Sequence, residues 1–293
     1  MAASMARYIA KNNTKFIKCL SVQKPHVRCL SSKNESALIS AKEEVNGVNF
    51  HYVRRGAGEH PILLMPGALG SGSSDFGPQL EKLDGSLFTI IAWDPRGYGK
   101  SIPPARDFPL DFFHRDASDA TGLMNKLGFK KFSMLGWSDG GITALVLAGT
   151  FPDVVRKMVV WGSNATVTEK DMKMYDDIRD VDKWSERMRA PLVAIYGREN
   201  LQALWSADLD YFWGVLDSRG GDICKTEMTK VRCPTLIIHG QKDAMVGQEH
   251  ADYLHSHING SKLVLLPDGK HNLHFKYATE FNQMVTEFLT EKS

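Results

Sequence analysis

Short apolar runs, each ending in Gly, Asp or Ser, alternate with helical patterns along most of the chain. Such runs are typical of parallel strands that are buried on both faces of a sheet. The expected strands are residues 61–67, 87–94, 131–138, 157–163, 234–240 and 262–269. The expected helices are residues 73–83, 111–127, 140–151, 247–258 and 276–290. This alternation predicts an α/β fold with a mostly parallel central sheet flanked by helices, and with ligands at the carboxyl ends of the strands.

Two segments depart from this alternation. Residues 43–56 alternate in polarity and carry Asn46-Gly47, a turn signal that predicts a β-hairpin. Residues 166–229 show no clear strand pattern and are rich in Trp, Tyr and Phe. We interpret them as a helical cap inserted between two strands of a domain that spans residues 37–293. The aromatic side chains of the cap either line a pocket or belong to ordinary packing, and the sequence leaves both open.

The first 36 residues differ in charge from the rest of the chain. They hold seven of the 36 Lys and Arg residues and one of the 34 Asp and Glu residues, which leaves 29 basic and 33 acidic residues elsewhere. A basic, acid-poor segment without an unbroken apolar core is typical of a cleaved organelle transit peptide, and the alternative is a disordered tail. The remainder predicts no nucleic-acid-binding face. No stretch approaches the ~20 apolar residues of a membrane span.

The sequence GWSDG (residues 136–140) matches the G-x-S-x-G pattern of a serine nucleophile on a strand-to-helix turn. A seryl oxygen needs a neighbouring base, and the base needs an orienting acceptor. Asp243 and His271 each come after an expected strand, so Ser138, Asp243 and His271 would meet at one edge of the sheet. Asp after a strand is also a common turn residue. We prefer His271 to His274, which we expect to be a solvated or packing residue.

An oxyanion formed at Ser138 requires two backbone N–H donors. One would be the amide of Asp139, and the other would come from the loop at residues 66–72, where we prefer Leu69 to Ala68. The glycines of that loop do not form a G-x-x-x-x-G-K-[ST] phosphate motif. Four irregularly spaced cysteines indicate neither a disulfide framework nor a zinc site. We therefore expect no cofactor and no metal.

The segment DPRGYGKS (residues 94–101) is expected to be structural, with Asp94 and Arg96 satisfying buried backbone groups near the site. Together with GWSDGG (136–141), HGQKD (239–243) and DGKHN (268–272), it resembles the α/β-hydrolase family. The resemblance covers residue 40 onward. Pro66 stands where that family usually has a His. This difference need not impair the oxyanion hole, because the hole is built from backbone amides.

More narrowly, the chain is similar to mitochondrial serine hydrolases of that family that cleave α-amino acid esters, including ester prodrugs. The resemblance implies that Ser138, Asp243 and His271 are the nucleophile, acid and base, and that Asp139 holds the substrate α-ammonium. It also implies a mitochondrial address. The carboxylate of Asp139 and the oxyanion formed at Ser138 would repel each other. A substrate ammonium near the scissile carbonyl would offset that repulsion. The alternative is that Asp139 only caps the following helix.

We therefore expect a serine hydrolase that forms a seryl acyl-enzyme from a small-molecule amino acid ester and acts as a monomer. Three alternatives remain. The chain would be a carbon–carbon bond hydrolase of ring-cleavage products, a thioester or thiolactone hydrolase, or a catalytically silent binding protein. An acid at position 139 would repel the carboxylate of a dienoate substrate, and an intact Ser–Asp–His set argues against a silent protein.

Overall fold

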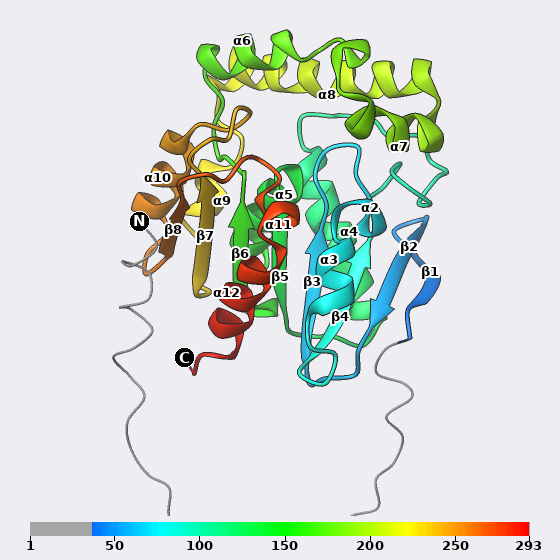
Figure 1. Cartoon of the computed structure of the whole chain (residues 1–293), viewed down its shortest axis with the longest axis vertical. Helices are drawn as coiled ribbons and strands as arrows, with labels where there is room; N and C mark the ends of the chain where they lie inside the picture. The colour runs from blue at the N-terminus through cyan, green and yellow to red at the C-terminus, as the bar shows by residue number, and fades with distance from the viewer. Residues whose placement is uncertain (1–36, 293) are drawn as a thin grey trace, which may run out of the picture. The chain divides into compact units, whose positions relative to one another are not determined.

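The computed structural model describes residues 37–292, so the predicted transit peptide lies outside the described residues. Eight strands form one sheet in the order β1-β2-β4-β3-β5-β6-β7-β8 (Figure 1). Pairing is antiparallel for β1 with β2 and for β2 with β4, and parallel elsewhere. The strands are β1 (Ile39–Val45), β2 (Val48–Arg55), β3 (His60–Met65), β4 (Phe88–Trp93), β5 (Phe132–Trp137), β6 (Val155–Trp161), β7 (Thr235–Gly240) and β8 (Lys262–Leu266). The predicted α/β class is confirmed.

The hairpin and the buried strands form for the reasons that the sequence suggested. Asn46 and Gly47 both have positive φ, as a two-residue turn between twisted strands requires. Every residue of β4 is buried, because helices cover both faces of the sheet. Two core clusters result, one on each face.

Helices α4 (Phe112–Lys126), α5 (Asp139–Thr150) and α10 (Gln248–His257) contribute to one core cluster. Helices α3 (Gly77–Lys82) and α12 (Ala278–Thr290) contribute to the other. The expected single helix over residues 73–83 is wrong, because α2 (Gly72–Asp75) ends before Phe76 and α3 begins after it. Phe76 leaves helical geometry to bury its ring completely. The expected helix over residues 276–290 corresponds to α12, and the short helix α11 (Leu273–Lys276) comes before it.

The segment between β6 and β7 is helical. It contains α6 (Glu169–Asp177), the 3-10 turn η2 (Val181–Lys183), α7 (Glu186–Tyr196), α8 (Arg198–Arg219) and α9 (Lys225–Met228). Helices α6, α7 and α8 lie together above the sheet in Figure 1. Several aromatic side chains of this cap are buried in the core, including Trp205 and Tyr211, so packing accounts for much of the aromatic content.

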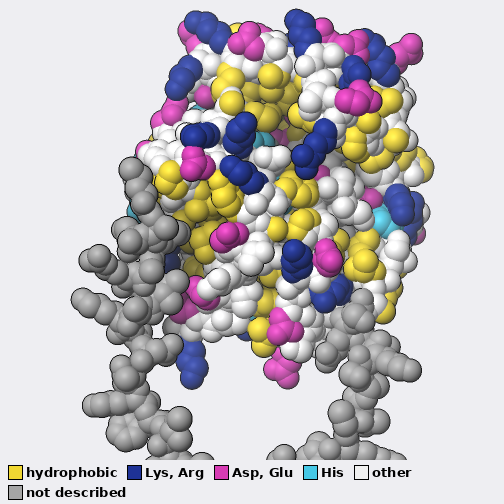
Figure 2. All heavy atoms as spheres, viewed as in Figure 1, with side chains coloured by type: hydrophobic (Ala, Val, Ile, Leu, Met, Phe, Trp, Pro, Cys, Tyr) yellow, Lys and Arg dark blue, Asp and Glu magenta, His cyan; other side chains and the backbone are white. Residues whose placement is uncertain are grey.

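Figure 2 shows Lys and Arg side chains interspersed with Asp and Glu side chains on the face drawn, with apolar side chains between them. A mixed surface of this kind differs from the clustered basic face that nucleic-acid binding needs. None of the helices within residues 37–292 is both long enough and apolar enough to cross a bilayer.

Candidate active site

Ser138 occupies the sharp turn between β5 and α5. Its φ is +54° and its ψ is −123°, a conformation that a residue with a Cβ rarely adopts. The Ser138 amide donates to the carbonyl of Trp161 at the end of β6 (3.0 Å), and Ser163 Oγ donates to the Ser138 carbonyl (2.9 Å). These bonds hold a strained backbone in place, which is common at functional sites.

The glycines around Ser138 permit this turn to pack closely. A Cβ built on Gly140 would lie 2.0 Å from the Met65 carbonyl oxygen, and one on Gly136 would lie 2.6 Å from the Gly140 carbonyl oxygen. Helix α5 therefore approaches the ends of β3 and β5 more closely than any larger residue would allow. A Cβ on Gly67 would lie 3.2 Å from Ser138 Cβ, which places the loop after β3 directly beside the serine.

The structure joins Asp243 and His271 directly. Asp243 Oδ2 lies 2.9 Å from His271 Nδ1, and Asp243 Oδ1 accepts the amides of Met245 (2.8 Å) and Val246 (3.0 Å). Burial opposes ionisation of Asp243, but His271 and the two amides outweigh it and hold the pKa of Asp243 below its usual value. Asp243 is therefore an anion that orients the imidazole, with Nδ1 carrying the proton and Nε2 left to accept one.

His271 and Ser138 are brought together through the end of β6. A Cβ built on Gly162 would lie 2.9 Å from His271 Cε1, and the residue before Gly162 accepts the Ser138 amide. Trp137 Nε1 also donates to the His271 carbonyl (3.0 Å). Within residues 37–292 no hydrogen bond joins Ser138 Oγ to His271. Such bonds commonly tighten only when substrate is bound.

The loop after β3 presents its backbone amides beside Ser138. Leu69 has a positive φ of 62°, and neither its amide nor that of Ala68 or Asp139 donates a hydrogen bond within residues 37–292. All three are therefore available to an oxyanion, and the structure does not choose between Ala68 and Leu69. Sequence reasoning missed Asp75 and Tyr196, which support this loop.

Asp75 and Tyr196 hold the loop from two sides. Asp75 Oδ2 accepts the amide of Gly67 (3.0 Å), and burial raises the pKa of Asp75 to about 7. Tyr196 of α7 donates its hydroxyl to the Leu69 carbonyl (2.9 Å) and accepts the amide of Gly99 (3.0 Å). The cap therefore contacts the loops that come after β3 and β4.

The Asp139 carboxyl is the unusual group of the site. Its Oδ2 atom is buried and has no hydrogen-bond partner among the described residues. Burial raises the pKa of Asp139 to about 7, with Arg106 and His271 acting in the opposite direction. The side chain does not cap α5, because no hydrogen bond links it to an amide of that helix within residues 37–292. The helix-capping alternative is therefore wrong.

The hydrogen bonds of His274, Asp94 and Arg96 test the remaining sequence predictions near the site. His274 is fully buried, accepts from Trp161 Nε1 at Nδ1 (2.9 Å) and donates to the Asp75 carbonyl, so it is a packing residue and not a solvated one. Asp94 accepts the amides of Gly72 (3.0 Å) and Lys100 (2.8 Å), as expected. The expectation for Arg96 is wrong, because its guanidinium pairs with the Asp119 carboxylate at 2.8 and 3.0 Å.

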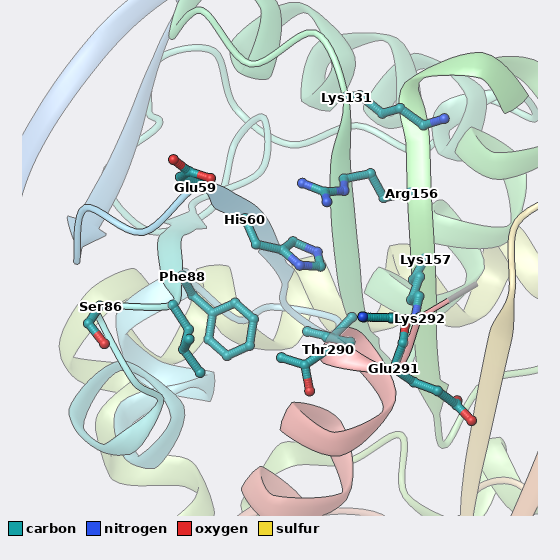
Figure 3. Close-up of a pocket in the computed structure, with 12 residues that line it drawn as sticks. Glu59, His60, Ser86, Phe88, Lys131, Arg156, Lys157, Thr290, Glu291 and Lys292 are labelled. Carbon is teal, nitrogen blue, oxygen red and sulfur yellow. The ribbon is translucent and has the colours of Figure 1, made fainter. Parts of the chain in front are cut away.

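A surface groove of about 1070 Å³ lies away from Ser138, at the edge where the strands begin (Figure 3). Its lining includes His60 and Phe88, which start β3 and β4, together with residues at the end of α12. Because Ser138, Asp243 and His271 lie beyond the carboxyl ends of their strands, this groove is not their substrate site.

Comparison with known proteins identifies the family to which this architecture belongs. Residues 60–195 match the model of the alpha/beta hydrolase fold. The chain is 53% identical to "Serine hydrolase BPHL" of Homo sapiens and 55% identical to that of Mus musculus, each over 254 residues that cover 87% of this chain and 87% of the relative. The chain belongs to the α/β-hydrolase family. It also resembles the crystal structure of a mutant of a meta-cleavage product hydrolase, CumD, with a TM-score of 0.71 and 21% identity over 87% of this chain and 99% of that one. At that identity the likeness concerns the fold alone.

Proposed function

We propose that this protein is a serine hydrolase that cleaves α-amino acid esters through a seryl acyl-enzyme. The observation that carries the proposal is the buried, unpartnered carboxyl oxygen of Asp139, directly after the predicted nucleophile. The high identity to two proteins named serine hydrolases supports the reaction type. The amine specificity rests on Asp139.

The reaction can be derived from the groups at the strand ends. Ser138 Oγ attacks the ester carbonyl carbon while His271 Nε2 accepts its proton, and Asp243 stabilises the resulting imidazolium. The amides of Asp139 and Leu69 or Ala68 hold the oxyanion without reorganisation. His271 then gives its proton to the departing alcohol. Water attacks the acyl-enzyme by the same route and releases the amino acid.

Asp139 makes the site electrostatically suited to a cation. A carboxylate beside a developing oxyanion raises the energy of the transition state, because like charges repel strongly where water is excluded. A substrate α-ammonium lies one carbon from the scissile carbonyl, so it would contact Asp139 when the carbonyl is at Ser138. The resulting charge-assisted hydrogen bond selects aminoacyl over simple acyl groups.

Replacing Asp139 with Asn is expected to reduce the preference for amines. For valine ethyl ester, kcat/KM should fall by about tenfold to a hundredfold, the equivalent of ~1–3 kcal/mol for a charged hydrogen bond. For ethyl 3-methylbutanoate, the same ester without its amine, the value should stay level or rise. Steady-state kinetics on both esters measures this, with the exposed Asp153→Asn as control. Equal losses on both esters would refute amine recognition by Asp139.

The preference for amines should also depend on pH in a defined way. Because the pKa of Asp139 is raised to about 7, the carboxyl is protonated below that pH and charged above it. The ratio of kcat/KM for the amino ester to that for the des-amino ester should rise from pH 5 through pH 7. It should fall above about pH 8 as the α-amine loses its charge. The ionisation of His271 affects both esters and cancels in the ratio. A ratio that does not change between pH 5 and 7 would contradict this assignment.

The alternatives are separated by direct assay. A carbon–carbon bond hydrolase would consume a yellow dienoate substrate, and a thioester or thiolactone hydrolase would prefer those acyl donors in a panel with and without the α-amine. Labelling of Ser138 by a fluorophosphonate would exclude a silent binding protein. The mitochondrial address of residues 1–36 and the monomeric state stay predictions.

A further inference from the structure

Four buried side-chain oxygen atoms lack hydrogen-bond partners within residues 37–292: Gln79 Oε1, and three others that come from three separate segments. These three are Tyr98 Oη in the loop after β4, Asp139 Oδ2 at the start of α5, and Asp208 Oδ1 in the cap helix α8. The side chains of Tyr98 and Asp208 are almost completely buried, at 2% and 1% exposure. A buried polar atom without a partner is costly, so a group of three calls for an explanation.

These atoms belong to one cluster. Burial raises the pKa of Asp208 well above its ordinary value, and the neighbouring charge of Asp139 raises it further. Burial also raises the pKa of Tyr98, and both carboxylates add to that effect. The contacts agree with this grouping. The Arg106 guanidinium lies 4.6 Å from the centre of the Tyr98 ring and 4.8 Å from that of Phe112, and the Phe112 ring packs 4.5 Å from Tyr211, which is three residues after Asp208 on α8. Helix α8 therefore brings Asp208 to the same region as Asp139, although the two residues are distant in the chain.

The nearby cation, Arg106, is paired through its two terminal nitrogens, and its buried Nε has no hydrogen-bond partner among the described residues. Arg106 donates to both carboxylate oxygens of Asp116, at 3.0 and 2.7 Å, and its guanidinium lies 4.6 Å from the centre of the Tyr98 ring. Arg106 stabilises the anions of Asp139 and Asp208 only through space, and no salt bridge among the described residues includes either of them. The cluster thus has two carboxyl groups and one phenol, and no cation among the described residues is hydrogen-bonded or ion-paired to either carboxyl group.

We propose that Asp208 and Tyr98 complete, with Asp139, a site of three oxygens that binds the substrate α-ammonium. A primary ammonium has three N–H donors and no acceptor, which matches three oxygens in need of donors. Two carboxyl groups that share one proton carry a single negative charge, which one ammonium neutralises. This inference rests on the proposed function and adds specificity residues outside the loop that bears Ser138.

The site makes a chemical distinction that Asp139 alone would not. An N-acylated amino acid ester has one N–H and no charge, so it leaves two of the three oxygens without donors. Such substrates should be rejected together with des-amino esters. Because Asp208 belongs to the cap, the cap itself takes part in selecting the acyl group.

The test is Asp208→Asn, which keeps the shape of the side chain and replaces one carboxyl oxygen with an NH2 group that cannot accept from an ammonium. For valine ethyl ester, kcat/KM should fall by about tenfold to a hundredfold, mainly through KM, because the contact between Asp208 and the ammonium is the same in the ground and transition states. For ethyl 3-methylbutanoate, kcat/KM should be nearly unchanged. Asp210→Asn on the same helix is the matched control, because Asp210 is exposed and pairs with Arg179 on the surface.

A second variant and a second measurement separate recognition from folding. Tyr98→Phe removes the hydroxyl while keeping the ring beside Arg106, and it should weaken the amino ester selectively. Valinol, an amine without an ester, should inhibit hydrolysis of the des-amino ester competitively, with a Ki at least about tenfold higher in Asp208→Asn. A lower melting temperature with equal losses on both esters would show that Asp208 is structural and overturn the inference.

The outcomes also distinguish this inference from the proposed function. If Asp139→Asn loses the preference for amines and Asp208→Asn keeps it, the function stands and the three-oxygen site is wrong. If the wild-type enzyme shows no preference for amines, the proposed function fails. In either case, a Ki for valinol that is the same in the wild-type enzyme and in Asp208→Asn would refute the three-oxygen site.

Discussion

Ser138→Ala is expected to lower kcat for valine ethyl ester by about 10⁵-fold or more, because no other group can form the acyl-enzyme. Among the serines that the structure describes, Ser138 alone combines a strained turn, adjacent loop amides and a nearby imidazole. The measurement is turnover of the purified protein, together with mass-spectrometric detection of a fluorophosphonate adduct on Ser138 in the wild-type enzyme.

Ser163→Ala is the control for that experiment. Ser163 donates to the Ser138 carbonyl from a buried position, so its loss should reduce activity modestly through positioning and leave labelling intact. Substantial activity in Ser138→Ala, or a label on a different serine, would be incompatible with the proposed mechanism.

Asp243→Asn is expected to lower kcat by about 10⁴-fold near neutral pH while leaving the fold intact. The carboxylate accepts from His271 Nδ1 and from two amides, and it holds the tautomer in which Nε2 can accept the Ser138 proton. An amide can donate to Nδ1 and thereby stabilise the wrong tautomer. Steady-state kinetics measures the loss, and circular dichroism with thermal melting verifies the fold.

Asp268→Asn is the matched control for Asp243. It also comes after a strand near His271, but its side chain is 69% exposed and pairs with Lys242 at the surface. It should retain the activity of the wild-type enzyme. If the two variants lost activity equally, the loss would reflect general disturbance of these loops and would remove the special role assigned to Asp243.

Much of the fold could be predicted because it rests on local patterns. Buried parallel strands such as β4 leave continuous apolar runs, and the Asn46-Gly47 turn permits little besides a hairpin. The break at Phe76 could not be predicted. That break depends on a pocket formed by residues of β6 and α12, where Phe76 packs edge-on against Trp161. Helical propensity over residues 73–83 carries no information about that pocket.

The candidate site also has a part that could be predicted from the sequence and a part that could not. Residue order alone predicted Ser138, Asp243 and His271 as a set, because the loops at the carboxyl ends of parallel strands lie along one edge of the sheet. The structure then brought Asp243 and His271 into direct contact, and it placed His271 against Gly162, the residue after the Trp161 carbonyl that accepts the Ser138 amide. Asp75 and Tyr196 were missed, since an Asp in a short helix and a Tyr in a cap are not distinctive in sequence.

The amino-acid sequence by itself determined the α/β class, the strained serine turn and the charge beside it, because each depends on neighbouring residues or on a repeating pattern. Only the tertiary structure decided the surroundings of Asp139. The position of Asp208 depends on how the cap helix α8 packs above the sheet, and whether a carboxyl oxygen finds a partner depends on every segment around it. Those quantities arise from contacts between residues distant in the chain, which no local pattern encodes.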